Sequence, residues 1–113
     1  MSGLEVLMEK SYLDRYKKLI EQNRYFEAHE ILEEWWFSLR FTKTDEVLLV
    51  KGLINAAVSF ELIKKERFTQ GLRVWQNFKK YEPKLLLLSK QKQIQYQPII
   101  DFINKIAKDK KLD

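Results

Sequence analysis

The stretch from about 45 to 65 constrains the fold more than any other part of this chain, because it is apolar on almost every side of a helix. Its apolar residues are Val47, Leu48, Leu49, Val50, Leu53, Ile54, Ala56, Ala57, Val58, Phe60, Leu62 and Ile63. Only Lys51, Asn55 and Ser59, spaced four residues apart, form a narrow polar stripe. A helix of this kind is stable only when other elements cover it, so the pattern predicts a central, buried helix.

The scarcity of turn-forming residues favours helices in the rest of the chain as well. Only 3 glycines and 2 prolines occur in 113 residues, whereas all-β folds need many turn residues. Apolar residues at helical spacing predict further helices over about 11–21, 25–40, 68–80, 84–90 and 98–108. We therefore expect an all-α fold, a compact bundle of five to six helices that forms a single domain over 1–113.

Local signals set the boundaries of these helices. Ser11 suits a helix start, and Leu4–Lys10 is either an earlier turn of the same helix or a loose end. Pro98 suits the first position of the last helix, which makes Gln91–Gln97 a loop. The tail over 109–113 is expected to fray.

Two glycines and one short connection complete the outline. Gly52 and Gly71 fall inside predicted helices, where glycine costs roughly 1 kcal/mol relative to alanine. We expect each of them to mark a place where a neighbouring helix approaches closely. Phe41–Lys43 is predicted to be a loop that precedes the central helix.

The predicted helix over 25–40 carries the only histidine of the chain and two of its three tryptophans. At 100° per residue, His29 falls at the edge of the apolar stripe and Glu33 just beyond it. Residues four apart are neighbours on a helix surface, so the spacing predicts contact between His29 and Glu33. Trp35, Trp36 and Phe37 follow one another, and a helix cannot bury three successive residues on one face.

This segment resembles a known family. The residues that carry the resemblance are Tyr25-Phe26-Glu27-Ala28-His29-Glu30-Ile31-Leu32-Glu33-Glu34-Trp35-Trp36. They are similar to the hallmark helix of the small all-helical proteins called domain of unknown function 309. Gly52-Leu53-Ile54 and Gly71 also match, so that the similarity covers about 12–80, although Lys51 stands where glutamine is usual. The resemblance implies a compact helical bundle and no particular activity.

The first functional hypothesis is a non-catalytic binding or interaction module. Its ligand would occupy a groove beside the His-Glu pair, and the candidate residues are His29, Glu30, Glu33, Trp36, Lys51 and Asn55. Glu33 would pair with either Lys51 or His29, and Asn55 would supply directional hydrogen bonds. The partner is an unknown small molecule or protein. An exposed aromatic among Trp35, Trp36 and Phe37 would suit a partner surface or a homodimer.

The second hypothesis is a hydrolase in which His29 is the general base and Glu33 orients it. The sequence supplies no evident nucleophile, since nothing ties Ser59 to His29. The alternative to both functions is a structural histidine at the edge of the core, satisfied by Glu33 or by a main-chain carbonyl.

Metal chemistry is not favoured. His29-Glu30-Ile31-Leu32-Glu33 lacks the second histidine of a zinc-protease helix, and the chain has no cysteine. Glu30 and Glu34 are expected to point away from the apolar face. We therefore expect no metal and no cofactor.

Charge is unevenly distributed along the chain. The net charge is +5, with 6 basic and 8 acidic residues in 1–40 but 15 and 8 in 41–113. The basic half makes weak nucleic-acid binding the third hypothesis, yet lysine predominates over arginine and no recognition motif is present, so nucleic acid is not favoured. No apolar run approaches the roughly 18 residues of a membrane span, and no secretory signal pattern is evident, so no membrane association and a cytoplasmic location are expected.

Overall fold

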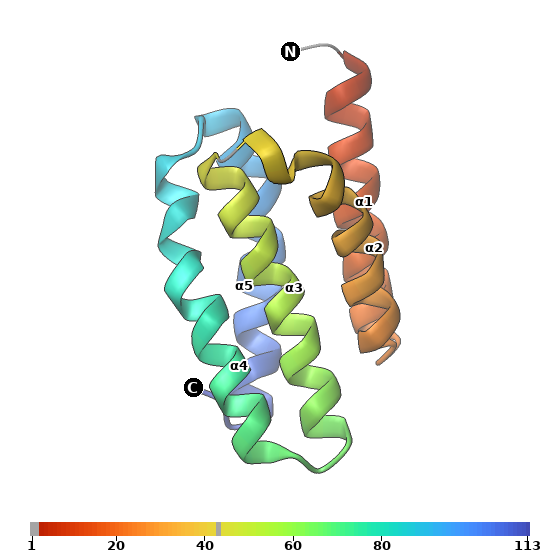
Figure 1. Ribbon diagram of the computed structural model, residues 1–113, viewed down its shortest axis with the longest axis vertical. Helices are drawn as coiled ribbons and strands as arrows, with labels where there is room; N and C mark the ends of the chain where they lie inside the picture. The colour runs from red at the N-terminus through yellow and green to blue at the C-terminus, as the bar shows by residue number, and fades with distance from the viewer. Residues whose placement is uncertain (1–2, 43) are drawn as a thin grey trace.

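The computed structural model describes residues 3–42 and 44–113, with side chains from residue 10 onward, and the regular secondary structure of that part is entirely helical (Figure 1). The elements are α1 (Gly3–Glu21), α2 (Tyr25–Leu39), the 3₁₀ turn η1 (Arg40–Thr42), α3 (Asp45–Lys64), α4 (Phe68–Tyr81), the 3₁₀ turn η2 (Glu82–Leu87) and α5 (Lys90–Asp109). They form an elongated bundle of 43 × 24 × 24 Å. The all-α fold predicted from the sequence is confirmed. Within the described residues, no helix is long and apolar enough to cross a bilayer.

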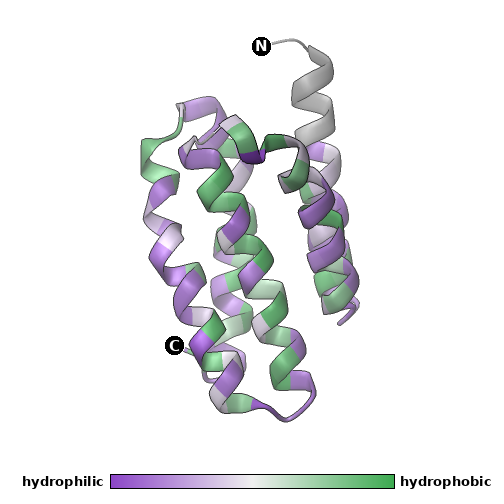
Figure 2. Ribbon diagram, viewed as in Figure 1, coloured by the Kyte–Doolittle hydropathy of each residue, from purple (hydrophilic) through white to green (hydrophobic). Residues whose placement is uncertain are grey.

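α3 occupies the centre of the bundle, as predicted. It lies between α2 and α4, and α5 passes behind it (Figure 1). Its side chains Leu49, Val50, Leu53, Ala56, Ala57 and Phe60 are fully buried. In Figure 2, α3 is largely hydrophobic, whereas the outer helix α4 is mostly hydrophilic. The burial of apolar surface on nearly all sides of α3 is the main source of stability for this arrangement.

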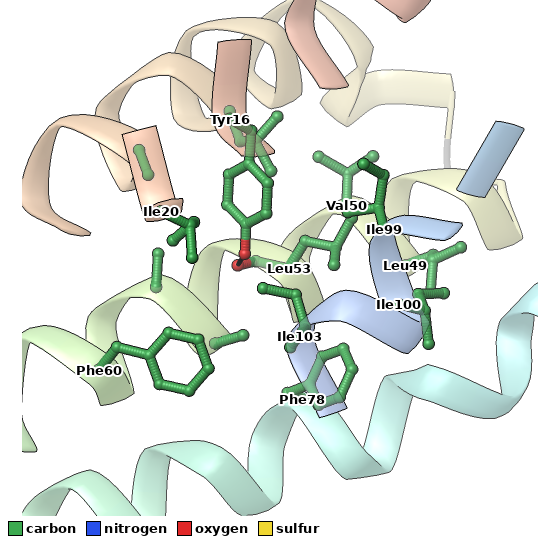
Figure 3. Packing of buried hydrophobic residues seen from close by; sticks show 14 of the residues in the cluster. Tyr16, Ile20, Leu49, Val50, Leu53, Phe60, Phe78, Ile99, Ile100 and Ile103 are labelled. Atoms are coloured by element: carbon green, nitrogen blue, oxygen red, sulfur yellow. Dashed lines mark hydrogen bonds between the residues drawn. The ribbon is translucent and has the colours of Figure 1, made fainter. Parts of the chain in front are cut away.

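The core is rich in aromatic residues. Tyr16 from α1 points toward α3 and donates a hydrogen bond of 2.8 Å to the carbonyl oxygen of Leu53 (Figure 3). Trp75 lies between Phe60 and Phe78, with ring centroids 5.8 and 4.7 Å away. These contacts join α1, α3 and α4 around one interior.

Both glycines mark close helix contacts, as expected. A Cβ atom on Gly71 would lie 2.6 Å from Cδ1 of Ile63 and 3.1 Å from the carbonyl oxygen of Ser59. The buried Ser59 hydroxyl donates a 2.6 Å hydrogen bond to the carbonyl oxygen of Gly71. A Cβ on Gly52 would lie 3.1 Å from Cβ of Tyr81. The absence of side chains at these two positions therefore sets the short distance between α3 and α4.

Three helices end with the same motif, in which one residue has a positive φ. Asn23, Glu66 and Lys111 have φ values of 60°, 63° and 63°. In each case the next residue donates its N–H to a carbonyl five residues earlier, as in Arg24 to Leu19 at 2.9 Å. The motif reverses the chain within two or three residues, and it forms here without glycine.

Two helix starts differ from the predictions. α1 begins at Gly3 rather than at Ser11, which confirms the first of the two alternatives for Leu4–Lys10, an earlier part of the same helix. The prediction of a loop over Gln91–Gln97 was wrong, because α5 begins at Lys90 and Pro98 lies in its interior. Ser89 caps this helix by accepting a 3.3 Å hydrogen bond from the Lys92 N–H. Pro98 is exposed, so its ring faces solvent rather than the core.

Three other predicted segments also differ. The chain over 84–89 forms no α-helix, because the η2 turn occupies most of it and α5 begins at Lys90. The predicted loop Phe41–Lys43 begins as the η1 turn, and Lys43 lies outside the described residues. The tail over 109–113 is packed rather than frayed: Leu112 is 5% exposed, and the Asp113 carboxylate accepts a 2.9 Å hydrogen bond from Trp75 Nε1. An apolar residue followed directly by a carboxylate was too little signal to predict this anchoring.

Candidate functional site

The His29 and Glu33 side chains form a contact on α2, as their spacing predicts. Nε2 of His29 lies 2.8 Å from Oε2 of Glu33. The contact follows from the way α2 packs, since Ala28, Leu32 and Trp35 are buried against the core. That orientation places His29 at the edge of the buried face, with its side chain 22% exposed, and Glu33 in solvent at 55%. The carboxylate therefore fixes the orientation of the imidazole from the solvent side.

The other ring nitrogen of His29 has no such partner. Nδ1 is closed off from solvent and makes no hydrogen bond to any residue that the structure describes. The Phe26 ring, one turn earlier on α2, lies 5.7 Å from the imidazole at an angle of 40°. An unsatisfied buried nitrogen is costly, so each such atom in a native protein calls for a structural or functional explanation.

A cleft of about 290 Å³ lies beside this histidine, between α2 and the C-terminal half of α3. We call it the His29 cleft, and it is lined by Phe26, His29, Val58, Glu61, Leu62, Lys65 and Arg67. Phe26, Val58 and Leu62 supply apolar surface, and the other side chains bring polar groups to it. An apolar pocket with a few polar groups that converge on it is the usual form of a ligand site.

The charged side chains of the cleft differ in what they contact. Lys65 Nζ lies 3.8 Å from a carboxylate oxygen of Glu61, and the Lys65 side chain is 61% exposed. Arg67 is exposed, and its guanidinium makes no hydrogen bond or ion pair within the part of the chain that the structure describes. Arg67 therefore keeps an uncompensated positive charge at the entrance to α4.

The structure separates the residues that were predicted to share one groove. Of the six candidates, only His29 lines the cleft. Glu30 faces the opposite side of α2, where it borders a hollow against α1 with Arg15 and Lys18. The role of Glu30 in binding stays a prediction, but the geometry does not connect it with His29.

Lys51 and Asn55 also lie apart from the cleft. Lys51 Nζ is 5.9 Å from the centre of the Tyr81 ring, and Asn55 donates a 2.8 Å hydrogen bond to the Lys51 carbonyl. Glu33 pairs with His29, one of the two partners predicted for it. Trp36 is half-buried, and its Nε1 is a second buried nitrogen with no partner in the described structure.

The sequence interpretation did not identify most of the cleft. Val58 and Leu62 were counted among the apolar residues of the buried helix, and Arg67 fell between the predicted helices over 45–65 and 68–80. One signal was available in the sequence, because Phe26 is aromatic but lies off the apolar stripe of its helix. In the structure its side chain is 56% exposed. Contiguous exposed apolar surface is what marks a contact site, and Phe26 forms such surface together with Val58 and Leu62.

The aromatic run at the end of α2 behaves as predicted. Trp35 is buried and Phe37 is 60% exposed, so the three residues do not all face the core. The Arg40 guanidinium lies 3.4 Å from the Phe37 ring centre and 4.2 Å from that of Phe41. The cation covers part of the apolar surface that these rings present to solvent.

Groups that other chemistry would need are placed elsewhere. No three His, Asp or Glu side chains converge on a common point in residues 10–42 and 44–113. The Ser59 hydroxyl is bonded to Gly71 on the α4 side of α3. The residues that line the His29 cleft include no serine, threonine or cysteine.

The fold and the site define a small all-helical domain with a single His-Glu pair next to an apolar cleft. Residues 13–74 match the family model described as domain of unknown function (DUF309), and the chain belongs to that family. The matched segment includes α2, α3 and all of the cleft residues. No curated protein and no solved structure matches the chain.

Proposed function

We propose that this protein is a non-catalytic binding module whose ligand occupies the His29 cleft. The observation that carries the proposal is the cleft itself, which has apolar side chains from α2 and α3 and charged groups at its edge. Its volume of about 290 Å³ is at the small end of ligand pockets, which suits a compact ligand. Glu33 restrains the imidazole, so that one wall of the site is already ordered before a ligand binds.

The geometry gives less support to a hydrolase. A histidine base needs a nucleophile or an activated water within hydrogen-bond reach of the substrate. Ser59, the serine nearest the centre of the chain, is fully buried, and its hydroxyl donates a hydrogen bond to the Gly71 carbonyl oxygen. The orientation of His29 by Glu33 is compatible with a base, but it serves equally well to hold a binding wall in place.

Nucleic-acid binding through the basic C-terminal half is also less well supported. Several of its lysines are engaged with acids: Lys79 with Glu82 at 3.0 Å and Lys84 with Asp45 at 3.6 Å. Lys92 lies 2.5 Å from Glu46. Neutralised lysines contribute little to the release of counterions that drives such binding.

A neutral probe tests the binding proposal. The probe is 3-phenyl-1-propanol, titrated into ¹⁵N-labelled protein, with amide shifts followed by NMR. We expect saturable shifts at Phe26, His29, Val58 and Leu62 at millimolar probe concentrations. Val58→Trp, which fills the cleft from the half-buried face of α3, is expected to abolish the shifts.

The matched control is Ile94→Trp, because Ile94 is an exposed apolar residue in another helix, 74% accessible. It is expected to leave the titration unchanged. Shifts spread evenly over the helices, or unchanged binding by Val58→Trp, would show that the cleft is not the site.

A further inference from the structure

The residues that line the His29 cleft include two cations, Lys65 and Arg67, but one carboxylate, Glu61, and this excess of positive charge in the lining indicates the kind of ligand. The Glu61 carboxylate lies 3.8 Å from Lys65 Nζ. Arg67 is the remaining charged group of the lining, and no described side chain or carbonyl accepts a hydrogen bond from its guanidinium. A ligand that complements this site therefore brings a negative charge to Arg67.

The rest of the lining specifies what that negative charge is attached to. Phe26, Val58 and Leu62 offer an aromatic ring and two branched aliphatic groups. Phe26 is 56% exposed, so a ligand that covers its ring removes apolar surface from water. A strongly hydrated polyanion would leave that surface uncovered, whereas a ligand with an apolar body would bury it.

Because the unpaired cation of the cleft is an arginine, its geometry indicates which anionic group the ligand carries. The planar guanidinium of arginine presents two parallel N–H groups that match the two oxygens of a carboxylate. The nearby Lys65 ammonium holds Glu61 at 3.8 Å with most of its side chain in solvent, so it remains available as a second, weaker donor. A single carboxylate satisfies Arg67 without requiring the cleft to accept further charge.

We propose that the His29 cleft binds a small monocarboxylate with an apolar or aromatic body, whose carboxylate pairs with Arg67. The body lies against Phe26, Val58 and Leu62. This inference rests on the proposed function, because it specifies the ligand of that same cleft.

The test uses three probes that share one phenylpropyl body and differ only in the terminal group. They are 3-phenylpropanoate, 3-phenyl-1-propanol and 3-phenylpropylamine, titrated by NMR at low salt. We expect the carboxylate to bind about fivefold to tenfold more tightly than the alcohol, since a charge-assisted pair adds affinity even at an exposed site. We expect the amine to bind most weakly.

Variants of arginine assign the preference to one residue. Arg67→Gln is expected to reduce the affinity for the carboxylate to that for the alcohol and to leave the alcohol unchanged. Arg73→Gln is the matched control, since Arg73 is an exposed arginine of α4 that does not line the cleft. It is expected to leave all three affinities unchanged.

The outcomes separate this inference from the proposed function. Equal affinity for the three probes, or an Arg67→Gln protein that still prefers the carboxylate, would overturn the assignment of the ligand class and leave the binding function standing. No shift at the cleft with any probe would overturn both.

Discussion

The Tyr16 hydroxyl donates a 2.8 Å hydrogen bond to the carbonyl oxygen of Leu53, and both residues are fully buried. This bond joins α1 to the central helix across 37 residues of chain. Because Leu53 lies inside α3, its carbonyl already belongs to the helical hydrogen-bond series, and Tyr16 uses its second lone pair. The apolar core thus contains one directional contact that fixes how α1 sits on α3.

Tyr16→Phe is expected to lower the free energy of unfolding by about 1 kcal/mol, because it removes the hydrogen bond and retains the ring. Urea denaturation followed by tryptophan fluorescence measures the change. Tyr12→Phe is the matched control: Tyr12 is half-buried and stacks on Trp35, and its hydroxyl makes no hydrogen bond within the described residues. Equal effects of the two substitutions would contradict a specific role for the bond to Leu53.

The same hydroxyl predicts a dependence of stability on alkaline pH. Burial raises the pKa of Tyr16 far above its ordinary value of 10.0, because the phenolate would lose its hydration. The unfolded chain releases this proton above that value while the folded protein retains it. The stabilisation is therefore complete below pH 10 and is lost as the pH rises further, by about 1.4 kcal/mol per pH unit.

Denaturation of the wild type and Tyr16→Phe between pH 8 and about pH 11 isolates this contribution, since the other tyrosines and lysines are common to both. The difference of about 1 kcal/mol at pH 8 is expected to vanish near pH 11. A difference that stays constant across this range would mean that Tyr16 ionises equally in both states.

The contact between α3 and α4 depends on the missing side chain of Gly71. Gly71→Ala gains roughly 1 kcal/mol of helix propensity, but its Cβ overlaps Cδ1 of Ile63 and crowds the Ser59 carbonyl. Overpacking of this kind costs about 1–3 kcal/mol, so a net loss of about 1 kcal/mol is expected.

Ile63→Val removes the Cδ1 atom that the new Cβ would meet. The two substitutions together are therefore expected to cost less than the sum of their separate effects, by about 0.5 kcal/mol or more in a double-mutant cycle. Strict additivity would place the strain elsewhere, at the carbonyl of Ser59.

Glu66 is poorly suited to the backbone conformation that it adopts in the turn between α3 and α4. It is exposed and has a φ of 63°, which costs a residue with a Cβ about 1–2 kcal/mol. Glu66→Gly is expected to raise the free energy of unfolding by about 0.5–1 kcal/mol after the entropy lost by glycine is subtracted. Asn23→Gly is the control, because Asn23 accepts a 2.8 Å hydrogen bond from the Tyr25 hydroxyl that glycine would remove. No gain of stability in Glu66→Gly would refute the argument from φ, and an equal gain in Asn23→Gly would show that the hydrogen bond from Tyr25 contributes nothing.

Two kinds of feature could be predicted from the sequence. One is the burial of a helix that is apolar on nearly all sides, and the other is the close approach of two helices at a glycine. The apolar surface of α3 and the small residues Gly52 and Gly71 are examples of these, because burial and close approach leave a mark in composition. The start of α5 was missed because Pro98 is a strong local signal, whereas the cap at Ser89 and the buried Tyr96 are weak ones. Tertiary packing of Tyr96 outweighed the local preference of proline for a helix start.

The candidate site was only half predictable for a related reason. His29 and Glu33 meet because residues four apart in the sequence lie on the same face of a helix. The opposite wall comes from Val58, Leu62 and Arg67, and their distance from His29 depends on how α3 is rotated and shifted against α2. No local pattern encodes that rotation, so Lys51 and Asn55, which share a broad face of α3 with Val58, were chosen in their place.

Substitution of Glu33 tests whether the His29–Glu33 pair serves ligand binding or only the fold. Glu33 is 55% exposed, and an exposed pair one turn apart contributes only about 0.3–0.5 kcal/mol, so Glu33→Gln is expected to change folding little. It weakens the hold on Nε2 and so loosens the wall of the cleft, and Glu33→Ala removes that hold altogether. Affinity for 3-phenylpropanoate is therefore expected to fall in the order wild type, Glu33→Gln, Glu33→Ala, with Glu34→Gln, an exposed neighbour on the same helix, equal to wild type. If the affinity falls only in proportion to the free energy of unfolding in all of these variants, the pair has a structural role. A role in binding instead requires the affinity to fall in variants whose stability is unchanged.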